Sequence, residues 1–322
     1  MLLESIRPLI TDDLAAVDRA IMRELKSNIP LIGQITEHIL LAGGKRIRPT
    51  VLLLSARALS YTGDQHIDLA AVIELIHTAT LLHDDVVDNT TLRRGHQTAH
   101  AIWGSASSVL VGDFLYSRAF QKVVELHHQT ILDIFAKATH YIAEGEMLQL
   151  MHCRNPDMTL ELYFDVIQRK TAKLFEVATE LGAIISGSSA TEITALRDYG
   201  NHLGLAYQLI DDTLDYSQSA QAVGKDVGQD LLEGKVTLPL IYAMQKSESN
   251  DLQLLRQAVQ SGSADHLGKI LDIVNKTGAI QSAQTVAKYH AEEAKNALSS
   301  IAISPYRDAL RSMSDFVIAR TY

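Results

Sequence analysis

The chain has 322 residues, of which 47% are hydrophobic, and it carries a formal net charge of −9 at pH 7. The length allows a sizeable core, and the acidic balance argues against a nucleic-acid partner, because nucleic-acid-binding surfaces carry a basic excess. A single cysteine, Cys153, favours a reducing compartment. Neither a secretory leader nor an apolar run near the roughly 20 residues of a membrane span is visible, so we expect a cytoplasmic protein without an integral membrane segment.

Apolar residues recur at helical spacing along most of the chain. Residues 35–40, 69–76 and 131–138 each carry apolar side chains three or four positions apart. Sustained period-two alternation is scarce, and no clear hairpin signal is present. With neither an internal repeat nor a linker, residues 1–322 are expected to form one all-helical domain.

Proline, glycine and serine indicate where the helices begin and end. Pro30 favours a helix start, and Gly43-Gly44 favours the end of that helix. Pro49 favours the start of the next helix. Turns are predicted at residues 155–157 and 186–189.

The first segment that suggests chemistry is HDDVVDNTTLRRG, from His83 to Gly95. Asp84 and Asp88 are four positions apart, so on a helix they share one face and lie about 6 Å apart along the axis. Asp85 lies beside them. Three such carboxylates repel one another, and a bound cation would make the arrangement tolerable.

A second set of aspartates follows another apolar run, in YQLIDDTLDY. It contains Asp211, Asp212 and Asp215. Two such helix faces could oppose each other across a cavity, and this suits Mg²⁺, which shares one or two carboxylates with substrate phosphates. One motif alone is better explained as a solvated acidic face, but two copies favour a metal site. The 20 polar, glycine-rich residues after Asp215 indicate a mobile loop.

Basic residues form four short clusters: Lys45 and Arg48 in GGKRIRP, Arg93 and Arg94, Arg169 and Lys170, and Lys225 in GKDVGQDLLEGKVTLP. Arginine and lysine side chains are the usual partners of phosphate oxygens. Each cluster alone is better explained as charged surface. Together with the acidic faces, the clusters predict a diphosphate substrate held partly by metal and partly by protein, and two basic sets would allow two diphosphates.

GGKRIRP, HDDVVD with RRG, YQLIDDTLD and GKDVGQDLLEGKVTLP occur in this order between Gly43 and Pro239. In this combination the chain resembles the trans-isoprenyl diphosphate synthases, the polyprenyl synthetase family. SVLVGDFLYSRAF and AEGEMLQL are most similar to segments of the bacterial octaprenyl diphosphate synthases. The resemblance implies an all-α isoprenoid-synthase fold, a large bundle of mostly antiparallel helices around a central cavity, and a homodimer.

The resemblance also implies roles for individual residues. The two aspartate motifs would hold about three Mg²⁺ ions, replaceable by Mn²⁺, with Asp84, Asp88 and Asp211 as metal ligands. The residues expected to act on the allylic diphosphate, besides the six aspartates, are Arg93, Lys170, Thr171, Gln208 and Lys225. Those expected to bind isopentenyl diphosphate are Gly44, Lys45, Arg48, His77 and Arg94. Lys235 lies in a matching segment, but its role is less defined.

The implied enzyme is a prenyltransferase that adds isopentenyl diphosphate repeatedly to an allylic primer such as farnesyl diphosphate. The allylic C–O bond breaks to give a carbocation and diphosphate, the double bond of isopentenyl diphosphate attacks the cation, and a proton is lost to the departing diphosphate. We expect octaprenyl diphosphate for a quinone side chain, with transient membrane contact for product release. The alternatives are a farnesyl, geranylgeranyl, nonaprenyl or decaprenyl synthase.

Residues near the first motif are expected to set the product length. The positions four and five before Asp84, roughly 6–7.5 Å deeper on a helix, are Thr80 and Ala79. Relatives that stop early carry a bulky aromatic near this level, so two small side chains predict a longer product. Met147 or Met151 would form the cavity floor. Alternatively, Ala79 and Thr80 are small only to allow helix packing.

Other protein classes explain fewer of these features. Glu74-x-x-His77 and Glu125-x-x-His128 have the spacing of di-iron ligands in helix bundles. Further ligands would have to come from Glu144, Glu146 or Glu176. That class leaves both aspartate motifs and the basic clusters unexplained. A terpene cyclase usually has a single motif of this kind, and a non-catalytic partner subunit usually loses one.

Overall fold

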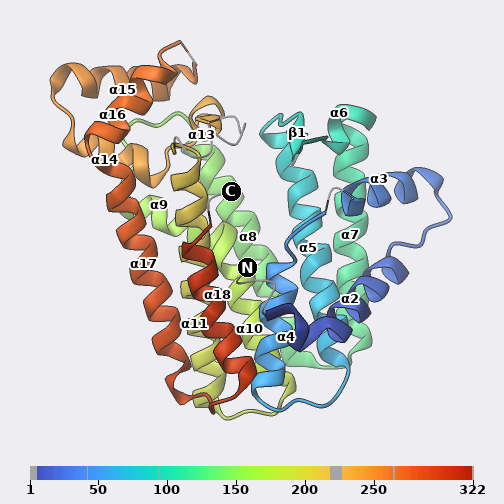
Figure 1. Cartoon of the computed structure of the whole chain (residues 1–322). Coiled ribbons are helices and arrows are strands. Elements are labelled where there is room, and N and C mark those ends of the chain that lie inside the picture. Colours follow the sequence, from blue (N-terminus) through green and yellow to red (C-terminus); the bar gives the residue numbers. More distant parts are fainter. Residues whose placement is uncertain (1–5, 42, 94, 218–226, 264, 321–322) are drawn as a thin grey trace.

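The computed structural model describes residues 6–41, 43–93, 95–217, 227–263 and 265–320, and these are mostly helical (Figure 1). The α-helices are α2 (Thr11–Glu24), α3 (Pro30–Leu41), α4 (Ile47–Ala58), α5 (Gln65–Val87), α6 (Ala99–Trp103), α7 (Ser105–Glu125), α8 (Gln129–Met151), α9 (Leu160–Ile167), α10 (Lys173–Ile185), α11 (Ala190–Leu214), α13 (Gln229–Leu232), α14 (Leu238–Lys246), α15 (Ser249–Ser261), α16 (Leu267–Lys276), α17 (Ala279–Ala297) and α18 (Pro305–Ile318). Two 3₁₀ segments, η1 (Arg7–Ile10) and η3 (Leu298–Ser300), and one π-helical segment, η2 (Gln168–Ala172), complete the helical structure. The predicted all-α class is confirmed.

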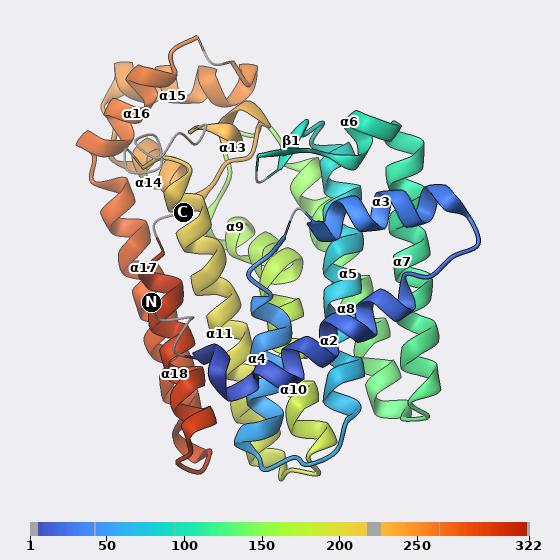
Figure 2. The ribbon, with the colours of Figure 1, turned by 45° about the vertical axis from the view of Figure 1, so that its right-hand side comes forward.

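The long helices lie side by side in one bundle (Figures 1 and 2). Helix α11 packs against α10 and α17, α10 packs against α4, and α5 packs against α7. Helices α15 and α16 lie at one end of the bundle, the end that also carries α13 and the strands (Figures 1 and 2). Helices α5 and α11 both finish at this end, so their C-termini are brought to the same region of the molecule.

The centre of the core is formed by α4 and α10. Ten of the twelve residues of α4 are buried, as expected for a helix with apolar residues on all sides. Gly182 lets α10 approach α4 closely, because a Cβ atom at this position would lie 2.8 Å from the Cβ atom of Ser55. These two helices give the bundle a rigid centre against which α5 and α11 pack.

The predicted helix boundaries are mostly confirmed. Helix α3 begins at Pro30, and both predicted turns separate helices. Helix α11 follows a capping box formed by Ser189 and Glu192. The prediction that Pro49 begins a helix is wrong: α4 begins at Ile47, after Arg46 in a left-handed conformation. Proline is tolerated at the third position of α4, because backbone N–H groups in the first turn need no helical acceptor.

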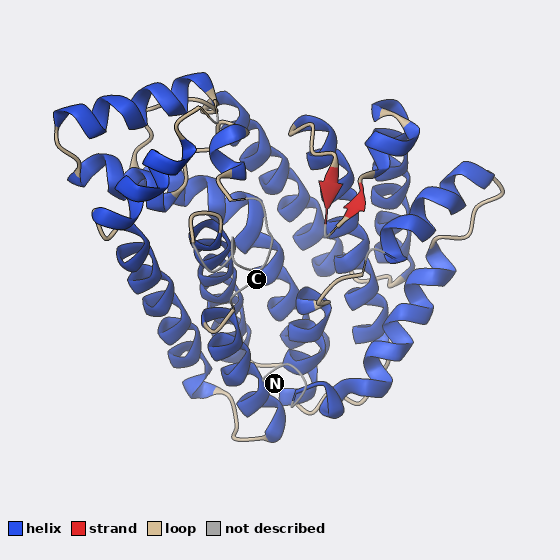
Figure 3. Ribbon diagram, turned by 45° about the horizontal axis from the view of Figure 1, so that its top comes forward, coloured by secondary structure: helices blue, strands red, loops and turns tan. Residues whose placement is uncertain are grey.

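Two features differ from the sequence-based expectations. Strands β1 (Leu92–Arg93) and β2 (His96–Gln97) form a short antiparallel hairpin where none was predicted (Figure 3). Gly95, at φ +79°, supplies the positive φ that the turn requires. Residues 218–226 of the predicted mobile loop lie outside the described residues, and the described remainder contains the short helix α13.

Candidate active site

Both aspartate motifs lie at the C-terminal ends of long helices. Asp84 is in the last turn of α5, and Asp88 is its C-cap residue. Asp211 is in the last turn of α11, and Asp215 is its C-cap residue. The helix dipole places negative partial charge at this end, so the carboxylates there are unfavourable unless cations compensate them.

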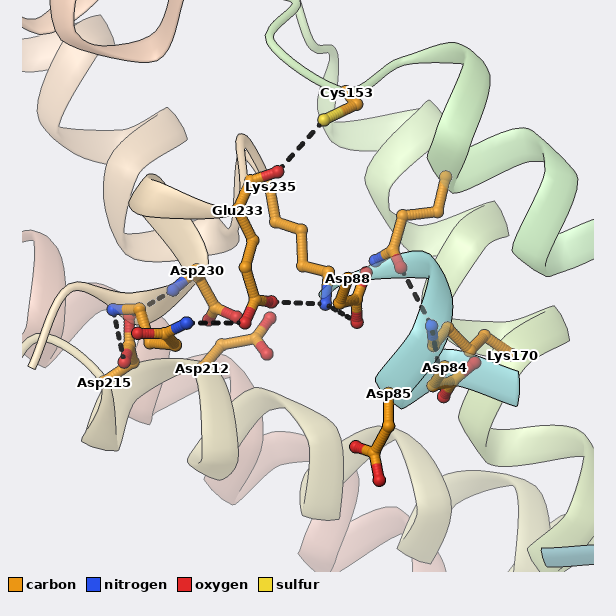
Figure 4. Close-up of polar contacts among 12 residues, drawn as sticks. Asp84, Asp85, Asp88, Cys153, Lys170, Asp212, Asp215, Asp230, Glu233 and Lys235 are labelled. Carbon is orange, nitrogen blue, oxygen red and sulfur yellow. Dashed lines mark hydrogen bonds and ion pairs between the residues drawn. The ribbon is translucent and has the colours of Figure 1, made fainter. Parts of the chain in front are cut away.

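Two lysines lie beside the first motif (Figure 4). The Nζ atom of Lys235 lies 2.6 Å from a carboxylate oxygen of Asp88 and 2.7 Å from one of Glu233. Burial lowers the pKa of Lys235, but the charges of Asp88, Glu233 and Asp230 outweigh it, so this pKa is raised well above its ordinary value. Lys170 lies 3.6 Å from Asp84.

Asp85, the remaining aspartate of the first motif, pairs with an arginine rather than a lysine. The guanidinium group of Arg93 donates to one Asp85 carboxylate oxygen from Nε, at 2.8 Å, and from Nη2, at 2.7 Å. Burial raises the pKa of Asp85 even though Arg93 lowers it. The pair links the β1–β2 hairpin to the end of α5.

The three aspartates of the second motif have different partners. Asp211 accepts from Arg320 at 2.7 Å, and the Arg320 guanidinium also lies over the ring of Tyr207. Burial raises the pKa of Asp211, while Arg320, Lys45 and Arg48 lower it. Asp215 accepts from the backbone N–H groups that begin α13, those of Gln229 and Asp230, both at 3.1 Å. Burial raises its pKa to about 6.

Asp212 belongs to a buried hydrogen-bond network. Tyr163 donates to one of its oxygens at 2.5 Å, and Gln208 donates to the other at 2.7 Å. Gln208 in turn accepts from the hydroxyl of Thr171 at 2.8 Å. Burial raises the pKa of Asp212 to about 7 despite these hydrogen bonds. The network links two predicted site residues, Thr171 and Gln208, to the second motif.

Thr171 and Lys170 lie on the π-helical segment η2, a geometry that is frequent at functional sites. Lys170 donates to Glu146 of α8 at 2.5 Å and to Gln149 of the same helix at 2.9 Å. Burial raises the pKa of Glu146 to about 7, although Lys170 lowers it. The segment therefore brings Lys170 next to both α8 and the first motif.

A cavity and a groove are lined by residues of the two motifs and their partners. A polar cavity of about 90 Å³ is lined by residues that include Lys170, Thr171, Gln208, Asp212 and Lys235. A larger and more apolar groove of about 560 Å³ lies between α5, α7 and α8 and includes Asp84 in its wall. Its other lining residues are Thr80, His83, Val87, Asp113, Tyr116, Ala136, Thr139, His140, Ile142, Ala143, Glu146, Met147 and Leu150.

The predicted product-length residues divide between groove and core. Thr80 and Met147 line the groove. Ala79 is 0% exposed and is not among the lining residues. Met151 is 70% exposed and also lies outside this lining.

The residues expected to bind isopentenyl diphosphate lie mainly around the start of α4. The guanidinium of Arg48 lies 4.5 Å from the ring centroid of Phe175 and 3.2 Å from a ring nitrogen of His77. Lys45 lies 5.9 Å from the ring centroid of Phe316. Gly44, which precedes Lys45 in the chain, is exposed. Arg94, and Lys225 of the allylic set, lie outside the described residues.

Residues 29–277 match the sequence profile of the polyprenyl synthetase family. The chain belongs to this family. It is 45% identical over 321 residues to the octaprenyl diphosphate synthase of Escherichia coli (strain K12), covering 99% of each chain. It is also 42% identical to an all-trans-nonaprenyl-diphosphate synthase of Rhodobacter capsulatus, covering 97% of this chain and 96% of that one.

Solved structures of polyprenyl synthases share the fold. The polyprenyl synthase of Caulobacter crescentus, crystallised with calcium and isoprenyl diphosphate, gives a TM-score of 0.95 at 41% identity, covering 99% of this chain and 98% of that one. A decaprenyl diphosphate synthase of Rhodobacter capsulatus gives a TM-score of 0.95 at 38% identity, with 99% of each chain covered. The predicted family and the isoprenoid-synthase fold are confirmed.

The donor set of this polyprenyl synthetase fits Mg²⁺ that arrives with a diphosphate. Within the described residues, no three histidine, cysteine, aspartate or glutamate side chains converge as a ready-made metal site. Mg²⁺ usually takes only one or two carboxylates and completes its shell with substrate phosphates and water. Asp84, Asp88 and Asp211 would hold the ions, which would neutralise negative charge on a leaving diphosphate when bound.

The di-iron alternative needs several carboxylates and histidines to converge, and its candidate residues are occupied elsewhere. Glu74 pairs with Arg46, and Glu125 pairs with Lys122. Within the part of the chain that the structure describes, the ligands required for a di-iron centre do not come together.

Several site residues were not assigned from the sequence. They are Gln149, Tyr163, Asp230, Glu233 and Arg320, together with Glu146, which was considered only as a possible iron ligand. Lys235, whose role the sequence left open, pairs with Asp88. One sequence feature could have pointed to the Glu146–Lys170 contact: Gly145 lies inside a helical pattern, and such a glycine often marks close packing with another element. The other contacts join residues far apart in the chain and have no local signature.

Proposed function

We propose that this chain is a long-chain all-trans polyprenyl diphosphate synthase. The observation that carries the proposal is the junction of a polar cavity, lined by Asp212, Lys170 and Lys235, with an apolar groove that has Asp84 in its wall. The two lysines of the cavity reach the first motif, because Lys170 lies 3.6 Å from Asp84 and Lys235 lies 2.6 Å from Asp88. A diphosphate head needs the first environment, and a growing hydrocarbon tail needs the second. The expected prenyltransferase class is confirmed by the similarity to octaprenyl, nonaprenyl and decaprenyl synthases.

The allylic diphosphate would bind at the junction. Lys170 and Lys235 line the cavity in positions to hold its phosphate oxygens, and positive charge there stabilises the charge that develops as the C–O bond breaks. Thr171 and Gln208 line the same cavity. The hydrocarbon tail of the allylic substrate would run past Thr80 into the groove, which could accommodate each lengthened product for the next cycle.

Isopentenyl diphosphate would bind on the side of α4. The charges of Lys45 and Arg48 act on Asp211, so this basic group adjoins the second motif. With His77 and Arg94, these residues would hold the diphosphate while its double bond faces the allylic carbon. The departing diphosphate can accept the proton that is lost, so no protein base is required.

The remaining assignments are proposals that rest on the family resemblance. We infer a cytoplasmic homodimer that uses Mg²⁺, makes octaprenyl diphosphate for a quinone and contacts a membrane transiently to release it. Within the described residues, no helix has the length and apolar character needed to cross a bilayer. Val87, Leu110, Leu150 and Met151 are exposed apolar side chains of α5, α7 and α8, the helices that border the groove, which supports a role for this face in association or product release.

Incubating the protein with farnesyl diphosphate, isopentenyl diphosphate and Mg²⁺, then sizing the products by chromatography, tests the proposal. Octaprenyl diphosphate is expected. A single condensation that stops at geranylgeranyl diphosphate would point to a short-chain synthase. An absence of any condensation by folded protein would overturn the proposed function. Iron analysis of the purified protein tests the di-iron alternative, which predicts about two iron ions per chain.

A further inference from the structure

Lys170 and Glu146 stand at the boundary between the polar cavity and the apolar groove. Lys170 lines the polar cavity, whereas Glu146 lines the groove, and their side chains meet at 2.5 Å. Asp84 lines the same groove and lies 3.6 Å from the Lys170 ammonium. The reacting carbon of an allylic diphosphate joins a charged head to an apolar tail, so it would lie beside this pair.

Close packing of α8 against η2 brings the two side chains together. A Cβ atom at Gly145 would lie 2.5 Å from the Cβ atom of Arg169 and 2.9 Å from the backbone nitrogen of Lys170. Only glycine allows this approach without moving the backbone. Glu146 and Gln149, three positions apart on α8, then share a face that meets Lys170.

The Lys170 ammonium has two hydrogen-bond acceptors and one further carboxylate nearby. Glu146 and Gln149 accept from it at 2.5 and 2.9 Å, while Asp84 is farther away at 3.6 Å. Lysine has a long flexible side chain and a compact charge, so its position depends on the acceptors that surround it. Without the Glu146 carboxylate, the nearest remaining negative charge for Lys170 is Asp84, which the proposed reaction needs as a metal ligand.

We propose that Glu146 is a positioning residue, which holds the Lys170 ammonium at the junction and keeps it from neutralising Asp84. This inference rests on the proposed function. It assigns Glu146 no contact with the reacting atoms: its effect is to leave Asp84 available to metal and Lys170 available to the allylic diphosphate. A neutral acceptor of the same length should perform much of this task, whereas an apolar side chain should not.

The test compares Glu146→Leu and Glu146→Gln with a matched control, Glu144→Leu. Glu144 is on the same helix and pairs with Arg169, the neighbour of Lys170 in η2. Glu146→Leu should raise the KM for farnesyl diphosphate about tenfold or more, because a charged hydrogen bond is lost, with the KM for isopentenyl diphosphate nearly unchanged. Glu146→Gln should stay within about threefold of wild type. Glu144→Leu should leave both constants unchanged.

A second measurement does not depend on turnover. Isothermal titration of inorganic diphosphate in the presence of Mg²⁺ should show weaker binding to Glu146→Leu than to wild type. In a Lys170→Met background, Glu146→Leu should cause little further weakening, because the two residues act as one unit. Additive losses in this cycle would overturn the inference, and so would equal defects in the Gln and Leu variants. If wild-type protein makes no polyprenyl diphosphate, the proposed function fails instead.

Should Glu146→Leu fail to fold, Glu146→Gln and Glu146→Ser, judged by circular dichroism, provide the same comparison. Glu146→Ser is too short to reach Lys170, so it should reproduce the rise in the KM for farnesyl diphosphate. Folded Glu146→Ser with both KM values at the wild-type level would contradict the positioning role.

Discussion

Within each motif, the aspartates divide into two kinds according to their partners. Asp85 is held by Arg93, Asp212 by Tyr163 and Gln208, and Asp215 by the first amides of α13. In contrast, Asp84, Asp88 and Asp211 pair only with Lys170, Lys235 and Arg320 among the ion pairs of the described residues, and no backbone or neutral side-chain donor is seen for their carboxylates there. We propose that these cations give way when a metal ion binds, and that Asp84, Asp88 and Asp211 are therefore the metal ligands.

Removing one of these proposed ligands should strongly lower the rate of turnover. Asp84→Ala and Asp211→Ala should each lower kcat by about a thousandfold or more, because each deletes charge that holds Mg²⁺ against the leaving diphosphate. Steady-state assays with and without a chelator measure the effect. Asp157→Ala, at an aspartate 71% exposed on the surface, is the control and should behave as wild type. Near-normal turnover by either motif variant would contradict the two-motif site.

The two basic groups should serve different substrates. Arg48→Ala should raise the KM for isopentenyl diphosphate about tenfold or more, and Lys235→Ala should do the same for farnesyl diphosphate, because each removes a charged donor to a phosphate. Initial rates with one substrate varied and the other saturating separate the constants. Equal effects of each variant on both substrates would refute the partition.

Asp212 should make stability depend on pH in a defined direction. Burial raises its pKa from 3.8 to about 7 in the folded protein. The folded state therefore retains a proton that the unfolded state releases, and the free energy of unfolding falls as pH rises from about 4 to about 7. In Mg²⁺-free buffer, Asp212→Asn should gain stability relative to wild type across this window, by on the order of 1 kcal/mol per pH unit. Denaturant unfolding at several pH values measures this, and a difference independent of pH would contradict it.

At the scale of elements, the groove is formed by α5, α7 and α8, with Asp84 in its wall. Thr80 lies one turn before Asp84 on α5 and lines the groove, while the neighbouring Ala79 is buried in the core. Adjacent helix positions point about 100° apart, so only one of these two small side chains faces the groove. Of the two positions, we therefore expect Thr80 rather than Ala79 to affect product length.

Thr80→Phe should shorten the product while early condensations persist, since an aromatic ring would fill the groove near its entrance. Ala79→Phe is the matched comparison: it should overpack the core and cost about 1–3 kcal/mol of stability, without a comparable change in product length. Chromatography of the products and thermal unfolding measure the two effects. Wild-type product length from folded, active Thr80→Phe would show that the tail does not pass this residue.

At the scale of the molecule, the site depends on a tightly packed centre. Glycines let helices approach closely at several crossings: Gly182 meets α4, Gly204 meets Ala172, and Gly200 meets Thr179. These contacts fix α4, α10 and α11 relative to one another. We propose that the whole chain unfolds as one cooperative domain, since the helices that carry the two motifs share this packed centre.

Gly182→Ala should lower stability by about 1–3 kcal/mol, because its Cβ atom would lie 2.9 Å from the backbone nitrogen of Ala56 and the helices must shift. Gly33→Ala, at a helical position with nothing within 4 Å of the added atom, should be neutral or slightly stabilising. Calorimetry should show one transition for all three proteins. Two separate transitions in wild type would contradict the single cooperative domain.

The sequence by itself determined the helical class, the start of α3 at Pro30, the turns around residues 155–157 and 186–189, and the two aspartate motifs. These depend on neighbours within a few positions: apolar periodicity, proline and serine at turns and helix starts, and the four-residue spacing of Asp84 and Asp88. The same local reasoning missed the β1–β2 hairpin, whose two-residue strands are too short for a periodic pattern.

Only the tertiary structure decided which aspartates are held by structural partners, which lysine meets which carboxylate, and which of Ala79 and Thr80 faces the groove. Lys235 and Asp88 are 147 positions apart, and Lys170 and Glu146 are 24 apart. Such contacts arise because packed helices bring their surfaces together at specific crossings, such as that of Gly145 with η2. The crossing is set by the shape of the whole core, so no local sequence pattern encodes the resulting pairs.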